Sequence, residues 1–364
     1  MLDRFQTQSP THLPAVDESN PSIAMSKPIF LPCTDGTRLG LGGAPLGNLF
    51  HPISDAQAHL VIETAWADGC RTFDTAPHYG HGLSERRMGD VLRHHERNNL
   101  CLSSKVGRLL TPDPNAPSEQ HGYVNTLPFV QHWDFSRSGI RRSMEDSLQR
   151  LGMTHLDAVF IHDIDEKTHG KQTEHVLQQV LDDTLPTLQR LKEEGLLSHI
   201  GLGVNDHHVV SRVLQHASFD CLLLAGRYSL LDQTALALMP ILQQKSIALA
   251  LGGVFNSGIL AQKLTHETQA TFDYAAAPAT LLDKAMRLQT ICDKFEVPLP
   301  AAALQFALAA PAEIVLLGIR TPQEWQQARQ AAAHKIPQAL WQELRELDLI
   351  PPTAPIPFNH QTHD

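Results

Sequence analysis

The stretch that decides the fold is Arg71-Thr72-Phe73-Asp74-Thr75-Ala76-Pro77-His78-Tyr79-Gly80. It predicts a β-strand that runs into a loop, because alternate side chains point to opposite faces and the proline ends regular pairing. An acid, Asp74, therefore stands at the carboxyl end of a strand, and Tyr79 lies on the loop just after it. A lone Asp at a strand end is more often a turn former than a catalyst, so the rest of the chain has to decide between the two roles.

Outward from this stretch, apolar runs alternate with amphipathic helical patterns. The expected strands cover residues 39–43, 71–75, 100–105, 156–162, 200–204, 221–224, 247–251 and 314–318. Continuous apolar runs are typical of parallel strands that are buried on both faces. Eight strand–helix units predict an α/β fold, a (β/α)8 TIM barrel. An open doubly wound sheet is the alternative, but Gly40-Leu41-Gly42-Gly43 lacks the final glycine spacing of a dinucleotide-binding turn.

The barrel is expected to span residues 28–350. An Asp35-Gly36 turn predicts an N-terminal β-hairpin over residues 28–41, and Leu340, Leu344 and Leu347 predict an extra C-terminal helix at 338–348. Residues 108–135 are expected to form a long loop. Residues 1–27 are polar, without the apolar core of a signal peptide, and predict a flexible extension; residues 351–364 predict a loose, proline-rich tail.

The composition argues against several classes of partner. The 364 residues carry a formal net charge of −10, and the pI is about 6.1, which argues against nucleic acid or an anionic membrane as a partner. The five cysteines include no CxxC pair, which indicates reduced thiols in a cytoplasmic protein. No apolar run approaches the ~18–20 residues of a membrane span. We expect a cytoplasmic protein that acts on a small molecule; the sequence gives no oligomeric state.

Polar residues follow three neighbouring strands at the rim where barrel enzymes place their active sites. Asp74 and Tyr79 follow the second strand, Lys105 ends the third and His162 ends the fourth. Singly, the lysine could be a rim charge and the histidine a core residue, but together the four favour a catalytic site. A free phenol has a pKa of about 10, and a nearby ammonium, anchored by a carboxylate, favours its phenolate form. Tyr79 is therefore the candidate general acid/base.

These residues lie in motifs that resemble the aldo-keto reductase family. The matching motifs are Phe73-Asp74-Thr75-Ala76 with Tyr79-Gly80 and Ser84-Glu85, then Ser104-Lys105, and a run over residues 143–157 followed by His162. The resemblance covers about residues 28–348. It implies hydride transfer with a nicotinamide cofactor, with Tyr79 as acid/base, Lys105 tuning it, Asp74 anchoring the lysine and His162 orienting the reacting oxygen.

The resemblance also implies where the cofactor binds. Backbone N–H groups after the seventh strand, and a helix N-terminus after the eighth, are suited to phosphates, although a turn and an ordinary helix cap would look the same. The cofactor is NADP or NAD, and Arg320 with Thr321 suits the 2′-phosphate of NADP. The candidate cofactor-binding residues are Asn205, Ser257, Gly258, Leu260, Gly318, Arg320 and Thr321.

Further stretches, at residues 203–205, 226–232 and 255–260, are similar to the aldose dehydrogenase branch of that family. This implies NAD(P)-dependent oxidation of the anomeric hydroxyl of an L-fucose or D-threo-aldose type sugar to a lactone, with Tyr79 as general base. His132, Trp133 and Asp163 are the candidate substrate-binding residues. Two alternatives share the same site: pyridoxal oxidation at the 4-position, and a general NADPH-dependent aldehyde or ketone reductase.

Two other classes of function agree less well with the sequence. A metal-dependent barrel hydrolase would need a third ligand beside histidine pairs such as His78 and His81 or His207 and His208, and none lies at the strand-end spacing, so no metal is expected. A binding protein that senses nicotinamide redox state on the same fold would not need Asp74, Tyr79, Lys105 and His162 together.

Overall fold

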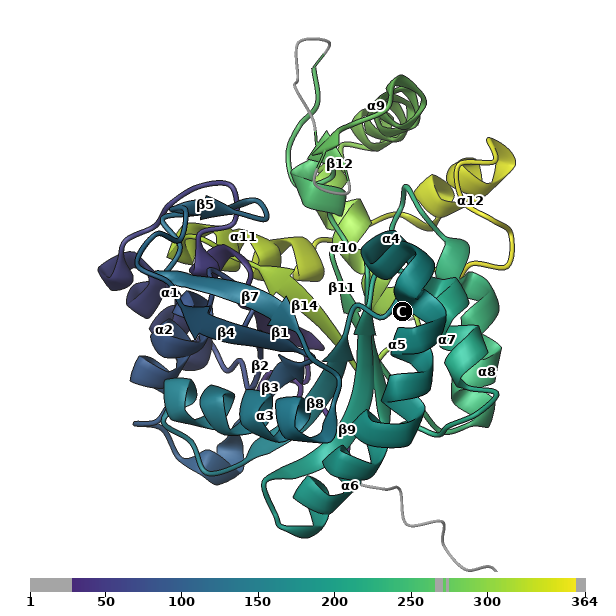
Figure 1. The fold of residues 1–364 in the computed structure, drawn as a ribbon. Helices are drawn as coiled ribbons and strands as arrows, with labels where there is room; N and C mark the ends of the chain where they lie inside the picture. The colour runs from purple at the N-terminus through teal and green to yellow at the C-terminus, as the bar shows by residue number, and fades with distance from the viewer. Residues whose placement is uncertain (1–27, 266–270, 273–274, 358–364) are drawn as a thin grey trace, which may run out of the picture.

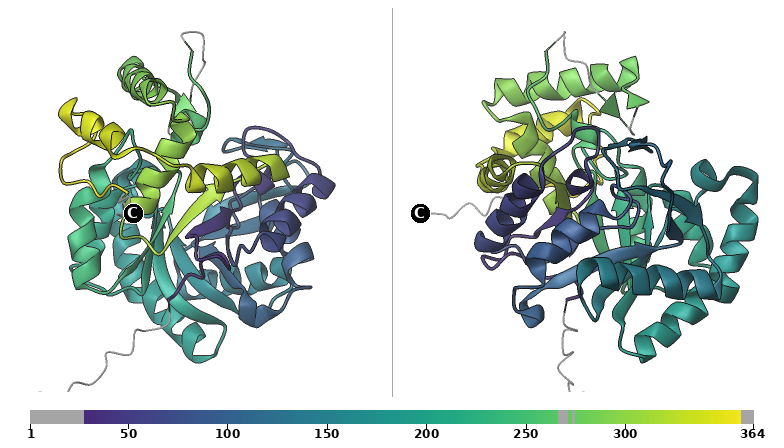
Figure 2. Two further views of the ribbon diagram at one scale, coloured as in Figure 1. Left: turned by 180° about the vertical axis from the view of Figure 1, so that it is seen from behind. Right: turned by 60° about the vertical axis from the view of Figure 1, so that its left-hand side comes forward.

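The computed structural model describes residues 28–265, 271–272 and 275–357. Eight parallel strands close into a barrel in the order β1-β14-β11-β10-β9-β8-β3-β2, and helices surround it (Figures 1 and 2). The predicted (β/α)8 barrel is therefore confirmed. The barrel strands are β1 Leu39–Gly42, β2 Thr72–Asp74, β3 Cys101–Val106, β8 Leu156–His162, β9 Leu197–Val204, β10 Cys221–Ala225, β11 Ala248–Gly252 and β14 Ile314–Gly318.

Most helices of the chain form the outer layer of this barrel. In Figure 1, α9 lies at the top beside the β12–β13 pair, and it packs on α10 and α12. None of the described helices is long and apolar enough to span a bilayer. The helices are α1 Asp55–Ala67, α2 Leu83–Leu92, α3 Arg137–Leu151, α4 Glu166–His169, α5 Thr173–Gln179, α6 Leu185–Glu193, α7 His207–Val213, α8 Met239–Gln244, α9 Ala279–Lys294, α10 Leu299–Ala309, α11 Pro322–Ala333 and α12 Gln338–Glu346.

Shorter elements fill the connections. The predicted extra C-terminal helix is α12, and a 3-10 helix over Thr234–Leu238 leads directly into α8. The remaining strands are β4 Arg108–Pro112, β5 Glu119–Gln120, β6 Tyr123–Val124, β7 Phe129–Trp133, β12 Thr271–Phe272 and β13 Ala275–Ala276. The short helices are η1 Pro45–Gly47, η2 Arg97–Asn99, η3 Gly170–Gln172, the π-helix η4 Val180–Thr184, η5 Thr234–Leu238 and η6 Asn256–Gly258.

The barrel interior is filled by alternate residues of its strands. Along β8, Ala158 and Phe160 face the interior cluster, while Val159 and Ile161 pack in the cluster under the helices. This two-residue alternation is what a parallel strand with two buried faces requires. Phe30 closes the interior from the amino side, with its ring stacked on Phe160 at 6.4 Å and an interplanar angle of 7°.

The predicted N-terminal hairpin is wrong, although its turn forms. Gly36 has φ +83°, and Cys33 N–H donates to Thr37 O at 2.8 Å, but residues 29–31 form no strand. Their backbone N–H groups bond to side chains instead, those of Ile29 and Phe30 to the Glu313 carboxylate. These residues do not pair as a strand, because side-chain acceptors already bind their backbone N–H groups.

Two further expectations change. Residues 108–135 are not a plain loop, because β4 and β7 pair as an antiparallel ribbon (Figure 1). The tail is held from residue 351 to 357, where Ala354 and Ile356 are buried and Arg345 donates to Ala354 O at 2.7 Å. The extension predicted at 1–27 and the tail beyond 357 lie outside the described residues.

Candidate active site

The centre of the carboxyl rim is a buried ion pair between Lys105 and Asp74. Lys105 Nζ donates to Asp74 Oδ2 at 2.7 Å and to Thr75 O at 2.9 Å, and Ser103 Oγ donates to the other carboxylate oxygen at 2.8 Å. The two side chains are 2% and 4% exposed. Burial raises the pKa of the Asp74 carboxyl, and Lys105 and Ser103 oppose that rise. Every polar atom of the pair is engaged, so the ammonium is fixed in place.

Tyr79 lies against this ammonium. Lys105 Nζ is 4.7 Å from the centre of the Tyr79 ring, and the His162 ring stands edge-on to Tyr79 with the centroids 6.3 Å apart. The register of the barrel strands explains why these side chains meet. Asp74 pairs with Ser103 and Lys105 pairs with Phe160, so the carboxyl ends of β2, β3 and β8 lie at the same level. The structure thus brings together the four residues that the sequence singled out.

His162 is buried as a neutral ring. Burial lowers its pKa well below the ordinary value of 6.5, and the charges of Arg108 and Lys105 and the neighbouring His78 act in the same direction. An imidazole with such a pKa carries no charge at pH 7. It can therefore donate one hydrogen bond and accept another.

The loop that carries Tyr79 is held by close backbone packing. A Cβ added at Gly47 would lie 2.7 Å from both Gly80 N and Tyr79 O, distances that real Cβ atoms do not show. Gly80 itself has φ +66°. Ser84 fixes the next turn, because its hydroxyl donates to Gly43 O at 2.7 Å and accepts from Thr75 Oγ1 at 2.8 Å. Two glycines and one serine thus set the height of the phenol above the rim.

Glu85, the other acid of the same motif, has a structural role. It is fully buried, and its carboxylate accepts from Ser104 Oγ at 2.7 Å and from Arg150 Nε. This joins α2 to β3 and α3 behind the site. The spacing of the motif therefore reflects helix anchoring as well as chemistry.

Arg108, at the start of β4, was missed in the sequence. Its guanidinium donates through Nη2 to Asp163 Oδ2 at 2.8 Å and lies 3.9 Å over the Trp133 ring. Burial lowers its pKa, and Asp163 opposes this. Its position three residues after Lys105 was the available signal, since it follows the same strand end into the site.

The predicted substrate-binding residues lie around that arginine. Asp163 is buried, and Asn205 Nδ2 donates to its Oδ1 at 3.2 Å. Trp133 keeps 37% of its surface exposed, but Phe135 stacks on it at 5.7 Å and His169 meets it edge-on at 4.5 Å. His132 is exposed on β7. Trp133 therefore acts first as a packing partner of Arg108, and Asp163 as its counter-ion.

The segment after β11 forms a concave backbone. Asn256, Ser257 and Gly258 follow one another with φ of +45°, +57° and +98°. Within this left-handed run, Asn256 N–H donates to Gly253 O at 2.9 Å and Gly258 N–H donates to Phe255 O at 3.0 Å. A Cβ added at Gly258 would meet no atom within 4 Å, so space is open beside it. Leu260 is fully buried and anchors the end of the turn. What this segment offers to a dinucleotide phosphate is the open space beside Gly258.

The segment after β14 is partly filled by its own helix. Thr321 caps α11 by accepting from Glu324 N at 3.1 Å, which is the ordinary helix cap that the sequence also allowed here. The Glu324 carboxylate accepts the Arg320 N–H at 2.7 Å, and its other oxygen lies 3.6 Å from Arg320 Nε. Gly318 is exposed beside Pro45. The Glu324 carboxylate thus already binds the Arg320 groups that the sequence suggested as phosphate ligands.

Three polar atoms of buried side chains at this rim have no hydrogen-bond partner among the described residues. They are His162 Nδ1, Arg108 Nε and Asn256 Oδ1. A buried polar atom without a partner is costly, so each is a candidate contact for a polar ligand. The first two lie beside Tyr79 and Asp163, and the third lies in the concave segment. The rim therefore offers unpartnered polar atoms to a polar ligand beside Tyr79, and one hydrogen-bond acceptor in the segment after β11.

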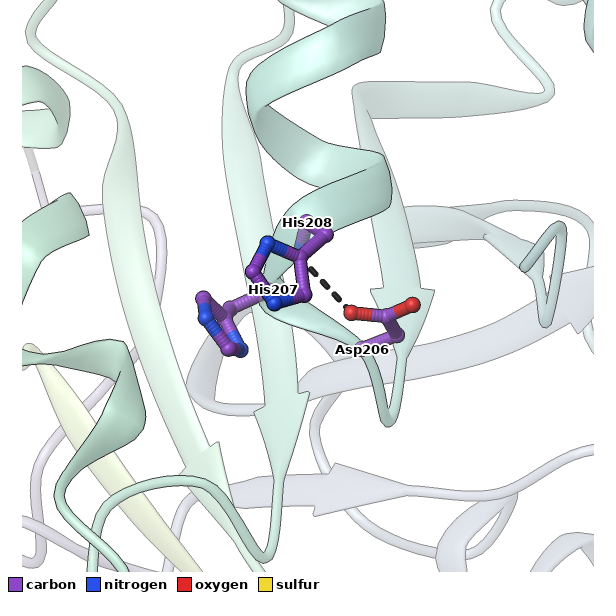
Figure 3. Close-up of side chains that lie close together, drawn as sticks. All are labelled: Asp206, His207 and His208. Atoms are coloured by element: carbon purple, nitrogen blue, oxygen red, sulfur yellow. Dashed lines mark hydrogen bonds between the residues drawn. The ribbon is translucent and has the colours of Figure 1, made fainter. Parts of the chain in front are cut away.

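One group of three potential metal ligands occurs in the part of the chain that the structure describes. Asp206, His207 and His208 follow one another at the start of α7 (Figure 3), and their ligand atoms lie within 4.8 Å of each other. Asp206 Oδ1 accepts the His208 N–H at 2.8 Å as the helix cap. Burial lowers the pKa of His207, and His208 adds to this. The capping bond accounts for the position of the carboxylate.

Comparisons with known proteins agree with this geometry. The model of the Aldo/keto reductase family matches residues 38–349. The chain is 41% identical over 326 residues to pyridoxal 4-dehydrogenase from Microbacterium luteolum, and 37% identical over 319 residues to D-threo-aldose 1-dehydrogenase from a Pseudomonas species. Each match covers 86% of this chain and 94% of the relative.

A solved structure supports the fold. An aldo-keto reductase from Bacillus halodurans, in its holo form, superposes with a TM-score of 0.66 at 21% identity, covering 90% of this chain and 95% of that one. The family uses a nicotinamide nucleotide as its redox partner. From the family match, the identities and the closed barrel, we conclude that the chain is an oxidoreductase that belongs to the aldo/keto reductase family.

Proposed function

We propose that this enzyme oxidises the anomeric hydroxyl of a cyclic aldose to a lactone, with Tyr79 as general base. The observation that carries the proposal is the Lys105 ammonium, which is held 2.7 Å from Asp74 Oδ2 and 4.7 Å from the Tyr79 ring centre. A fixed cation beside a phenol favours the phenolate, which is the form that accepts a proton from a hydroxyl. The similarity to D-threo-aldose 1-dehydrogenase supports the direction and the substrate class.

The proton and the substrate oxygen are handled by residues of this chain. Tyr79 takes the proton of the anomeric hydroxyl, and neutral His162 hydrogen-bonds the same oxygen and orients it. A bound nicotinamide would supply the acceptor for the hydride that leaves the anomeric carbon. The unpartnered His162 Nδ1 and Arg108 Nε suit a substrate with several hydroxyls, since each needs a polar contact that an apolar aldehyde lacks.

Of the two nucleotides, we propose that NAD is preferred. The Glu324 carboxylate accepts the Arg320 N–H at 2.7 Å, which is the helix-terminal group that a 2′-phosphate would use. A carboxylate at that position repels a phosphate and can instead accept hydrogen bonds from ribose hydroxyls. Arg320 is already engaged with this acid, with Nε 3.6 Å from it.

A second candidate function is oxidation of pyridoxal, and one observation favours it. The 41% identity to pyridoxal 4-dehydrogenase extends over the same part of the chain as the match to the aldose enzyme. The chemistry of Tyr79, Lys105 and His162 would be the same, because a cyclic hemiacetal is again the group oxidised. The two candidates differ in the substrate ring, that of an aldose or that of pyridoxal, which has to fit beside Trp133 and Arg108.

The test is an absorbance assay at the reduced-nicotinamide band. The purified chain is mixed with NAD+ or NADP+ and with L-fucose, D-arabinose, L-galactose or pyridoxal. We expect turnover with an aldose and identification of a lactone as product. Turnover with pyridoxal alone selects the second candidate, and no turnover with any of the four rejects both. Reduction of simple aldehydes without any oxidation of hemiacetals indicates a general reductase.

A further inference from the structure

The Asp163 carboxylate lies between two nitrogen groups. Its Oδ2 accepts from Arg108 Nη2 at 2.8 Å, and the same oxygen lies 3.4 Å from His162 Nε2. The Arg108 and Asp163 side chains are only 10% and 11% exposed. One buried anionic oxygen thus faces a permanent cation and an imidazole that could also take a charge.

The backbone at Asp163 keeps its carboxylate in this place. Its φ is +43°, in the left-handed region that costs free energy for a residue with a Cβ. The strained turn is held on both sides, because Asp163 N–H donates to Gly203 O at 2.9 Å and His169 Nε2 lies 2.8 Å from Asp163 O. The carboxylate is therefore fixed beside His162.

The charge on Arg108 decides what this carboxylate does to the histidine. A buried carboxylate beside an imidazole favours the imidazolium, and a cation bound to that carboxylate cancels the effect. Arginine suits this role because its guanidinium does not lose its proton in proteins. The titratable and charged groups around His162 come from its own strand end, from β3, from β4 and from the loop after β2: Asp163, Lys105, Arg108, His78 and Tyr79.

We propose that Arg108 is a positioning residue: by binding the Asp163 carboxylate, it keeps His162 a neutral imidazole and holds it beside Tyr79. The catalytic meaning of this rests on the function proposed above. An imidazolium would donate to the reacting oxygen as an acid and favour reduction of a carbonyl. A neutral ring leaves the hydroxyl proton to Tyr79, as oxidation requires.

Other contacts hold the guanidinium in its place. Arg108 lies 3.9 Å over the Trp133 ring, and its Nη1 is 3.4 Å from His78 Nδ1. The same carboxylate that binds it also accepts from Asn205 Nδ2 at 3.2 Å, at the end of β9. The ribbon of β4 and β7 is thereby joined through one anion to the ends of β8 and β9. Loss of Arg108 would free the anion for His162.

The test is a proton titration of His162 by NMR on histidine labelled at Cε1, with the resonance assigned by its absence in His162→Gln. In the unaltered chain we expect no titration midpoint between pH 6 and 8, since the pKa of His162 lies well below 6.5. In Arg108→Gln, and in Arg108→Met, which keeps an apolar stem on Trp133, the midpoint rises by about 1 to 3 pH units. In Arg108→Gln/Asp163→Asn it returns to the original range.

Each outcome decides the proposal. A midpoint that stays low in a folded Arg108→Gln or Arg108→Met chain overturns it, as does a double variant that titrates like the single ones. The matched control is Arg141→Gln, which removes an arginine from the exposed pair with Glu194 and should leave His162 unchanged. Circular dichroism establishes which variants fold.

The NMR measurement needs no substrate. Its result therefore tests the role of Arg108 even if the proposed aldose oxidation is wrong. A second readout uses turnover: the kcat/KM profile of Arg108→Gln should gain an acid limb at the new His162 midpoint, which the double variant loses. A structural role for Arg108 alone would lower activity at every pH without moving the profile.

Discussion

The Lys105 ammonium and the Asp74 carboxylate share a 2.7 Å hydrogen bond in a part of the barrel rim that is almost closed to water. The pair links two adjacent strands, β3 and β2, and one of its members touches the Tyr79 ring. Stability and proton transfer therefore depend on the same two charges. This coupling is the basis of the first prediction.

Asp74→Ala should destabilise the enzyme strongly. It leaves the Lys105 charge buried without its counter-ion, which costs about 3–5 kcal/mol in the free energy of unfolding. Asp74→Ala/Lys105→Met removes both charges and should lose less than the single variant. Urea unfolding followed by fluorescence measures both. A single variant that is as stable as the double would contradict the assignment of Lys105 as a charge that needs Asp74.

Gly47→Ala should lower kcat by moving the Tyr79 loop. The new methyl group would meet Gly80 N and Tyr79 O at 2.7 Å, and backbone has to shift to relieve this. A displacement of about 1 Å at a reacting group can cost about a hundredfold in rate. Cofactor affinity, measured by fluorescence quenching, should change little. Gly252→Ala is the control, since its Cβ would meet ordinary contacts at 3.7 Å; equal losses of kcat in both variants would refute the effect.

Glu324→Gln should shift the cofactor preference toward NADP. It removes the negative charge that lies beside Arg320 N and Nε and frees Arg320 for a phosphate. We expect the ratio of kcat/KM for NADP+ to that for NAD+ to rise about tenfold, which is about 1.4 kcal/mol. Glu346→Gln, an exposed change on α12, is the matched control. An unchanged ratio in Glu324→Gln would show that the 2′-phosphate binds elsewhere.

The enzyme should lose stability as the pH falls from about 6.5. Burial, and the Arg108 charge after it, lower the pKa of His78 and of His162 well below 6.5. Between the folded and unfolded pKa values the unfolded chain binds a proton that the folded chain does not, so the free energy of unfolding decreases with falling pH. Each such histidine contributes about 1.4 kcal/mol per pH unit.

His78→Gln isolates one of these contributions. Urea unfolding at pH 7.5, 6.5 and 5.5 should show a shallower pH dependence for this variant than for the unaltered chain. Subtracting the curve of the variant from that of the unaltered chain removes the contribution of Asp74 and Asp163, which is present in both. The raised pKa values of these two acids change stability in the opposite sense at lower pH. Parallel curves would mean that His78 takes up a proton in the folded enzyme as readily as in the unfolded one.

The barrel could be predicted because its strands are long apolar runs whose partners follow in chain order, as at Leu156–His162 and Leu197–Val204. The strand ends then brought Asp74, Lys105 and His162 to one rim. Local patterns failed where a distant group decides the structure. Glu313 takes the N–H groups of the segment that looked like a hairpin strand, and β4 finds its partner β7 only across a long connection.

The same reason explains which contacts within the site could not be predicted. Asp163 looked like a free acceptor for a substrate hydroxyl, because its counter-ion Arg108 lies 55 residues away in the sequence. Trp133 looked like an open wall, but Arg108 covers one of its faces. Arg320 looked like a phosphate ligand until the capping geometry brought Glu324 onto it. For Asp163 and Trp133, the missing information was a cation that only the fold brings to them.

The central claim is that Tyr79 is the base that removes the proton of an anomeric hydroxyl. The measurement that tests it most directly compares the unaltered enzyme with Tyr79→Phe in the oxidation of an accepted aldose, under saturating NAD+, with the lactone quantified. We predict that the variant loses at least about a hundredfold in kcat and keeps its affinity for NAD+ in fluorescence titration. A Tyr79→Phe enzyme that forms lactone at the original rate would contradict the account.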